Sequence, residues 1–151
     1  LGKPASGADI QVNLSDGLAD GMIDTERSEH LTLAGDTRLT KGMIDAADEA
    51  YDAALDLQPD AIATRLARAQ LRAETQDWDG LAEDADVLVE QAPYLAAGWR
   101  YRGQAHLAGG ELDAAGAAME KAREQEPDDV PSLVLRGAIL EARRTATNDD
   151  E

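Results

Sequence analysis

The sequence contains no cysteine and no phenylalanine, and only 3% of its residues are aromatic. Without cysteine the chain forms no disulfide and has no thiol chemistry, so its redox compartment cannot be inferred from cysteine usage. No hydrophobic run approaches the roughly 18 residues that a membrane-spanning helix requires. Basic residues are scarce, 14 against 31 acidic ones, and the net charge is −17. Nucleic acid is therefore an unfavourable partner, because phosphates bind to basic surfaces.

Patterns typical of catalysis and of metal binding are also missing. The two histidines, His30 and His106, are far apart in the sequence and form no pair of metal ligands at helical spacing. Gly109 and Gly110 follow no strand pattern, so they do not form a phosphate-binding loop. The many carboxylates are expected on outward helix faces, where they are ordinary solvated charges. We therefore expect no enzyme activity, no cofactor and no metal site.

Prolines divide the chain at a fixed interval, since the step from Pro59 to Pro93 equals the step from Pro93 to Pro127. Other positions recur in the same frame, and in the middle repeat the large and small residues exchange places. The recurring sets are Gly35, Ala69, Gly103 and Gly137; Ala47, Leu81 and Ala115; Tyr51, Ala85 and Met119; and Ala54, Leu88 and Ala122. Two antiparallel helices approach closely only where one side chain is small, so this pattern indicates paired helices.

The frame resembles the tetratricopeptide repeat, a helix-turn-helix unit whose length matches the interval between these prolines. The stretch from Trp99 through Gly103, Ala115 and Met119 to Pro127 carries the clearest match. The resemblance covers about residues 28 to 143. It implies an all-α fold, a right-handed superhelical stack of antiparallel helix pairs with a terminal capping helix.

This frame also predicts where the elements begin and end, because proline cannot continue a helix and a turn glycine permits a positive φ. The expected helices span about 26–40, 43–57, 61–74, 77–91, 95–108, 111–125 and 129–144, the last capped by Asp128 or Asp129. They form repeats at about 28–59, 62–93 and 96–127 within a repeat domain of residues 25–144. Residues 1–24 are expected to be an irregular N-terminal arm or linker, and residues 145–151 a disordered acidic tail.

In tetratricopeptide proteins the first helix of each repeat lines a concave groove that holds an extended peptide or a helix of a partner. The resemblance therefore implies a protein-interaction scaffold with a protein or peptide partner. Tyr101 either anchors that partner or packs between repeats, and both interpretations remain open. The groove positions implied for this chain are Thr32, Asp36, Leu66, Gln70, Arg100, Tyr101 and Gln104, with Leu107 near the end of the same helix.

One subclass of the family clamps the carboxylate end of a chaperone peptide with two lysines, two asparagines and an arginine. None of these residue types stands at the matching places in this chain, so an acidic chaperone tail is an unfavourable ligand. The matching places hold Thr32, Asp36, Ala67, Ala97 and Tyr101.

Arginine also recurs once in each repeat length, at Arg68, Arg102 and Arg136, where the family more often has leucine. In one interpretation the side-chain stems pack beside the small residues and the guanidinium groups pair with acids of a neighbouring repeat. In the other, the arginines form a basic ladder that binds a carboxylate ligand.

The last expected helix has apolar residues on more than one face, whereas a terminal helix in a repeat stack normally turns a polar face outward. This pattern predicts a self-association or docking surface that includes Leu135 and Ile139, with a homodimer as one form. The alternative is that the groove or the N-terminal arm covers these residues. A small-molecule or lipid pocket beside this helix is a further alternative.

The first residue is Leu1 and not methionine, so we expect either a cytoplasmic protein or, if a signal peptide was removed, a periplasmic one. The high content of alanine and arginine suggests a bacterial source.

Overall fold

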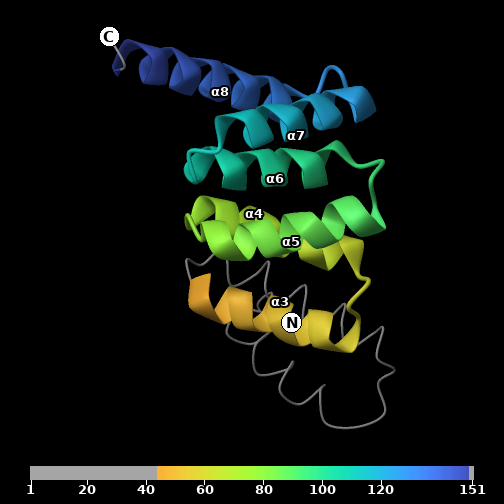
Figure 1. Ribbon diagram of the computed structural model, residues 1–151. Coiled ribbons are helices and arrows are strands. Elements are labelled where there is room, and N and C mark those ends of the chain that lie inside the picture. The colour runs from red at the N-terminus through yellow and green to blue at the C-terminus, as the bar shows by residue number, and fades with distance from the viewer. Residues whose placement is uncertain (1–43, 150–151) are drawn as a thin grey trace, which may run out of the picture. The chain divides into compact units, whose positions relative to one another are not determined.

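The computed structural model describes residues 44–149, and every element in this range is a helix (Figure 1). The expected helices from 43–57 to 111–125 are confirmed, since each begins one residue later than predicted and ends where predicted. Thr32, Asp36, the arm of residues 1–24 and the expected helix 26–40 lie outside the described residues. The helices are α3 (Ile44–Leu57), α4 (Ile62–Glu74), α5 (Trp78–Gln91), α6 (Ala96–Ala108), α7 (Leu112–Gln125) and α8 (Val130–Asp149).

The chain divides into two compact units, Leu1–Leu71 and Arg72–Glu151, and the boundary falls inside α4. In the described part of the first unit, α3 and α4 pack through Ala47, Tyr51 and Leu71, which are at most 1% exposed. The side chain of Tyr51 fills the space beside the small Ala47. Tyr51 is thus fully buried in the contact between α3 and α4.

In the second unit, α6 packs against α5 and α7, and α8 packs against α7 and α6 (Figure 1). The core between the last helices is a cluster of Ala115, Met119, Leu135 and Ile139, with Leu107 packed against it. Ala115 and Met119 are four residues apart in α7, as are Leu135 and Ile139 in α8, so one stripe of each of these two helices is buried.

In the middle repeat a large residue stands where the other repeats have a small one. This change is compensated by a smaller residue on the helix that it contacts. Leu88 takes the place of the small Ala54 and Ala122, and it is 1% exposed. It packs against Gly98, where a Cβ atom would lie only 3.0 Å from the Leu88 Cβ. Gly98 replaces a larger residue, since the same position in the next repeat is Ser132. A loss of volume on one helix thus accommodates a gain on the other, as close packing requires.

The turns between paired helices need a left-handed backbone. Gly110 has a φ of +75° between α6 and α7, and Gln76, at the same position of the preceding repeat, has a φ of +60° between α4 and α5. The glycine adopts this conformation without steric cost, whereas the glutamine does so against the clash of its Cβ atom. The repeat geometry therefore imposes the same turn on both sequences.

The end of α8 differs from the prediction. The helix runs to Asp149, so the expectation of a helix end near 144 and of a disordered tail from 145 is wrong for residues 145–149. The Thr145 hydroxyl donates to the Glu141 carbonyl at 3.0 Å, and the Thr147 hydroxyl donates to the Arg144 carbonyl at 2.9 Å. These local bonds allow exposed polar residues to continue the helix.

The expectation that the carboxylates lie on outward faces is wrong for Asp84, which is 0% exposed. Asp84 stands where the other repeats have the small residues Ala50 and Ala118. Its Oδ2 atom accepts a hydrogen bond from Arg72 Nη1 at 3.1 Å. The buried carboxylate is thus held by a guanidinium group that is itself only 12% exposed.

Candidate functional site: an apolar groove between α6 and α8

The second unit has an apolar groove between α6 and α8, with a volume of about 550 Å³. Gln104 is the polar side chain among its walls, and the remaining lining residues are apolar. We call it the α6–α8 groove. Its lining residues are Trp78 from α5, Gln104, Leu107 and Ala108 from α6, and Val130, Pro131, Val134, Leu135 and Ala138 from α8.

One face of α8 forms a wall of the groove because Val130, Val134 and Ala138 are four residues apart. Val130 and Val134 are 67% and 68% exposed, so their apolar surface faces solvent. Leu135 forms part of the floor and is 4% exposed. The helix thus buries one stripe and presents a second apolar stripe to the groove.

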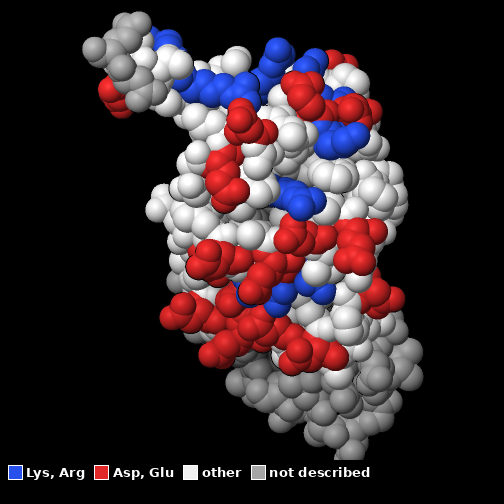
Figure 2. All heavy atoms as spheres, viewed as in Figure 1, with Lys and Arg blue, Asp and Glu red and all other residues white. Residues whose placement is uncertain are grey.

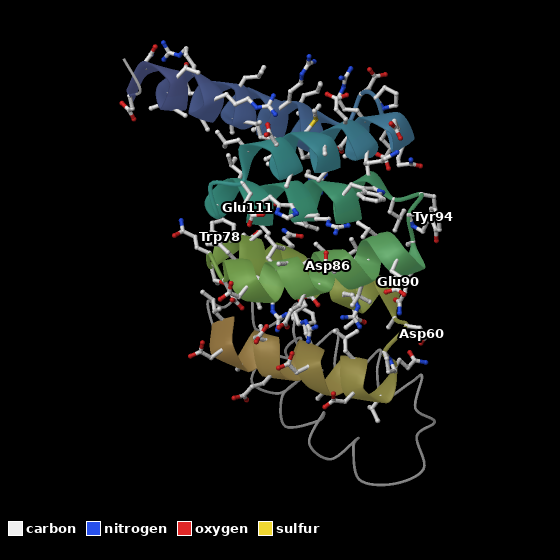
Figure 3. The ribbon with its side chains drawn as sticks, viewed as in Figure 1. Asp60, Trp78, Asp86, Glu90, Tyr94 and Glu111 are labelled. Carbon is white, nitrogen blue, oxygen red and sulfur yellow. The ribbon has the colours of Figure 1, made fainter. Side chains whose placement is uncertain are left out.

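Trp78 contributes the aromatic surface of the groove and is 36% exposed. It is the first residue of α5, and the helix start is capped by Asp77, which accepts a hydrogen bond from the Gly80 N–H at 3.1 Å. Figure 3 shows Trp78 and Glu111 at the same end of the helices of this unit, with Tyr94 at the opposite end. The cap therefore fixes the backbone from which the indole ring extends toward the groove.

Gln104 carries an unusual acceptor. Its side-chain oxygen Oε1 is buried and has no hydrogen-bond partner among the described residues. A buried acceptor without a partner costs about 1–3 kcal/mol, so a donor from a ligand would be favourable here. The groove thus combines an apolar wall with a glutamine side chain whose buried oxygen has no partner among the described residues.

Arg100 and Tyr101 lie close to Gln104 in the sequence, but both are used within the fold. Arg100 Nη1 donates to Asp129 Oδ2 at 2.9 Å, and both side chains are 15% exposed. The Arg100 guanidinium also lies 5.2 Å from the centre of the Tyr101 ring. Tyr101 is only 9% exposed, so the structure favours its packing role over the role of a ligand anchor.

Asp129 also caps α8, because its carboxylate accepts hydrogen bonds from the Ser132 backbone N–H, at 2.9 Å, and from the Ser132 hydroxyl. The predicted cap is therefore confirmed. Burial alone raises the pKa of Asp129, but the hydrogen bonds from Ser132 and from Arg100 outweigh that effect. The pKa of the carboxyl group consequently lies below its ordinary value of 3.8.

The other predicted groove residues are not gathered at this site. Leu66 is half-buried and Gln70 is exposed, and both belong to the first unit. Leu135 and Ile139 are 4% and 3% exposed within the core, so the prediction that they form an association surface is wrong. The large apolar residues of α8 that are exposed are Val130, Leu133, Val134 and Leu140.

Two of the three recurring arginines, Arg68 and Arg102, pair with acids of the preceding helix, which supports the packing and ion-pair role for them. Arg68 donates to Asp52 at 2.5 Å, and Arg102 Nε lies 3.3 Å from Asp86 Oδ1. A basic ladder is not available at these two positions, because the charges are compensated. Arg136 is exposed, and no ion pair of its side chain occurs within residues 44–149.

Charge is unevenly distributed over the second unit, as Figure 2 shows for one face. Acidic side chains gather over α5, whereas basic side chains lie along α8. The acids of α5 that face solvent follow one helix face, at Asp79, Glu83, Asp86 and Glu90. On this face the acidic side chains therefore gather over α5 and not along α8.

Within the described range, no three His, Asp or Glu side chains are grouped so that they could hold a metal ion. None of the helices α3 to α8 is both long and apolar enough to cross a membrane.

Sequence reasoning found Gln104 and Leu107 but missed Trp78 and Val134 as groove residues. The available signal was the second apolar stripe of α8, at residues four apart. That signal marks a face but does not say which helix lies opposite it.

No protein-family model matches the sequence, and no curated protein matches it either. Several solved structures are similar to the structure of this chain. The first tetratricopeptide domain of Spaghetti (RPAP3), bound to the HSP90 peptide SRMEEVD, is 20% identical over 81% of this chain and 97% of its own, with a TM-score of 0.74. A tetratricopeptide repeat protein from Parabacteroides merdae is 17% identical over 92% of this chain and 53% of its own, with a TM-score of 0.78. The TPR2B domain of yeast Sti1, in a pHsp70 complex, is 18% identical over 78% of this chain and 97% of its own, with a TM-score of 0.68. The chain therefore has the tetratricopeptide-repeat fold.

Proposed function

We propose that this chain is a protein-interaction scaffold that binds an apolar segment of a partner protein in the α6–α8 groove. The observation that carries the proposal is the groove itself, whose lining includes the exposed residues Trp78 and Val134 and the side chain of Gln104, with its buried, unpartnered Oε1 atom. A peptide supplies both features that this site lacks, since its apolar side chains cover the walls and its backbone N–H can donate to Gln104. The proposal concerns binding and not catalysis.

Peptide-bound structures of the same fold support this class of function. The domains from Spaghetti and from yeast Sti1 were solved with an HSP90 peptide and in a pHsp70 complex. The acidic character of the SRMEEVD peptide is not carried over to this chain. Ala67, Ala97 and Tyr101 offer no cationic clamp, and Arg100 is neutralised by Asp129. With a net charge of −17, the chain favours a partner segment that is apolar with neutral or basic flanks.

The test is selection of peptides from a random library displayed on phage, followed by affinity measurement with synthetic peptides by fluorescence polarisation. Val134→Glu should weaken binding of the selected peptides at least about tenfold, because it places a charge on the apolar wall. Gln104→Leu should weaken it less, since only one hydrogen bond is lost.

Two matched variants serve as controls. Leu133→Glu changes an exposed apolar residue next to Val134 that does not line the groove. Tyr94→Glu changes a 66% exposed residue at the other end of the helices (Figure 3). Both should bind the selected peptides as the unaltered chain does. Peptides that bind the Val134→Glu chain with full affinity would show that the groove is not the site.

A second candidate function is binding of a small apolar molecule or lipid. The volume of about 550 Å³ favours it, because ligand pockets are typically about 300–1,000 Å³. The two functions are separated by competition with a fatty acid such as laurate. Displacement of the selected peptides by laurate would place the lipid in the same groove, whereas retention of the peptides would leave the peptide function alone.

A further inference from the structure

A second hollow adjoins the α6–α8 groove and has a different chemistry. It lies between α5 and α6, has a volume of about 380 Å³, and shares two lining residues with the groove, Trp78 and Ala108. We call it the acidic hollow. Its charged lining residues are Asp79 and Asp86 from α5, Arg102 and His106 from α6, and Glu111, the N-cap residue of α7.

Trp78 is the residue at which the two hollows meet. It lines both of them, and 36% of its surface is exposed. Figure 3 shows Trp78 and Glu111 at the same end of the helices of this unit, with Asp86 further along α5. A partner segment that lies in the groove and leaves it at this end therefore passes Trp78 and enters the acidic hollow.

The charges that line the acidic hollow do not cancel. Arg102 Nε lies 3.3 Å from Asp86 Oδ1, so these two charges compensate each other. His106 Nδ1 lies 3.3 Å from Glu111 Oε2, and this contact is an ion pair only when the histidine is protonated. Asp79 is exposed and forms no ion pair within the described part of the chain. With a neutral His106, the carboxylates of Asp79 and Glu111 thus remain without a compensating cation.

Building on the proposed function, we infer that the partner segment carries a lysine or arginine next to its apolar residues. The apolar residues fill the α6–α8 groove, and the basic side chain lies against Trp78 in the acidic hollow. An indole face attracts a cation, and Asp79 and Glu111 attract the same charge. A carboxylate at this position would be repelled, so the acidic hollow also disfavours a fatty acid whose head group lies at this end.

A side-chain cation fits the acidic hollow better than a metal ion does. Among residues 44–149, no three His, Asp or Glu side chains are grouped so that they could hold a metal ion. A lysine or arginine needs fewer carboxylates, because charge-assisted hydrogen bonds and the contact with the ring add to the attraction. The apolar stem of such a side chain also covers apolar surface beside the groove.

The experiment uses the full 151-residue chain and the peptides selected on it from the random library. We expect the selected peptides to carry a lysine or arginine at a fixed distance from their apolar residues. One such peptide is compared, by fluorescence polarisation, with a matched peptide in which glutamine replaces the basic residue. The protein variant with both Asp79→Asn and Glu111→Gln should bind the basic peptide about three- to tenfold more weakly, since each exposed ion pair contributes modestly.

The same variant should bind the glutamine peptide as the unaltered chain does, which also shows that its fold and its groove are intact. Net charge alone favours a basic peptide, so a second variant removes two charges away from the acidic hollow. Asp79 and Glu111 lie at the starts of α5 and α7, and the control substitutions Glu90→Gln and Glu126→Gln lie at the ends of the same helices. Glu90 is at the opposite end of the helices from Glu111 in Figure 3. This control variant should bind both peptides with nearly unchanged affinity.

An equal loss of affinity for the basic peptide in both double variants would overturn the inference, because the preference would then come from net charge. Selected peptides that lack a basic residue but lose affinity for the Val134→Glu chain would also overturn it, and would leave the proposed function standing. Selected peptides that bind the Val134→Glu chain with full affinity would overturn both.

Discussion

Arg102 Nε lies 3.3 Å from Asp86 Oδ1 and repeats, in the next repeat along the chain, the ion pair that Arg68 forms with Asp52. Both side chains of the later pair are more than a third exposed, at 38% and 63%. Two residues away in the same helix, Asp84 is fully buried and pairs with Arg72 at 3.1 Å. The two acids of α5 thus form ion pairs in opposite environments, which leads to the first prediction.

Substitution of Asp84 should cost much more stability than substitution of Asp86. Asp84→Ala leaves a guanidinium group largely buried without its main partner, and we expect a loss of about 3 kcal/mol or more. Asp86→Ala removes a solvent-screened pair, and we expect a loss below about 1 kcal/mol. Urea unfolding followed by circular dichroism measures both. Similar losses of stability for the two variants would show that burial of an ion pair does not determine how much the pair contributes to stability.

Exchange of the turn residues tests the left-handed positions. Gln76→Gly removes the strain of a positive φ, and the larger entropy of glycine in the unfolded chain offsets part of the gain. We expect a net stabilisation of up to about 1 kcal/mol. Gly110→Gln places the same strain into the second turn and should destabilise the fold by about 1–2 kcal/mol. Thermal and urea unfolding measure the stability of both variants. A destabilising Gln76→Gly or a stabilising Gly110→Gln would contradict the prediction.

The lowered pKa of Asp129 predicts a pH dependence. A carboxylate whose pKa is lower in the folded state stabilises the fold above its unfolded pKa, and this stabilisation is lost as the pH falls through the folded pKa. The unfolding free energy of the unaltered chain should therefore exceed that of Asp129→Asn by a constant amount at neutral pH, and the difference should shrink below about pH 4.

Urea unfolding of both chains at a series of pH values from neutral to acidic gives this difference. Comparison with Asp129→Asn matters because the other carboxylates of the chain titrate equally in both proteins. Asparagine also keeps the capping hydrogen bond to Ser132, so the helix start is preserved. A difference that stays constant to the lowest pH would contradict the assignment.

Helix positions were predictable because their causes are local. Apolar residues three and four apart mark one helix face, and Pro59, Pro93 and Pro127 end the second helix of each repeat. The end of α8 was mispredicted because no proline or glycine follows residue 144. Polar composition alone suggested disorder, whereas the threonine hydroxyls bond to the preceding carbonyls.

The candidate site was only partly predictable. Gln104 could be found from its place in the repeat, and it lines the groove. Tyr101 and Arg100 occupy comparable places in the same helix, yet one is packed in the core and the other is paired with Asp129. Such differences depend on the residues that lie opposite them in space, which a one-dimensional pattern does not contain.

The sequence by itself determined the repeat length, the helix pairs and the positions that must be small, because each follows from local periodicity or from a backbone restriction. The tertiary structure alone decided which carboxylate is buried and which apolar stripe of α8 is covered. Burial depends on contacts between helices that are far apart in the chain. For that reason Asp84 lies in the core, and Val134 and Leu133 remain exposed.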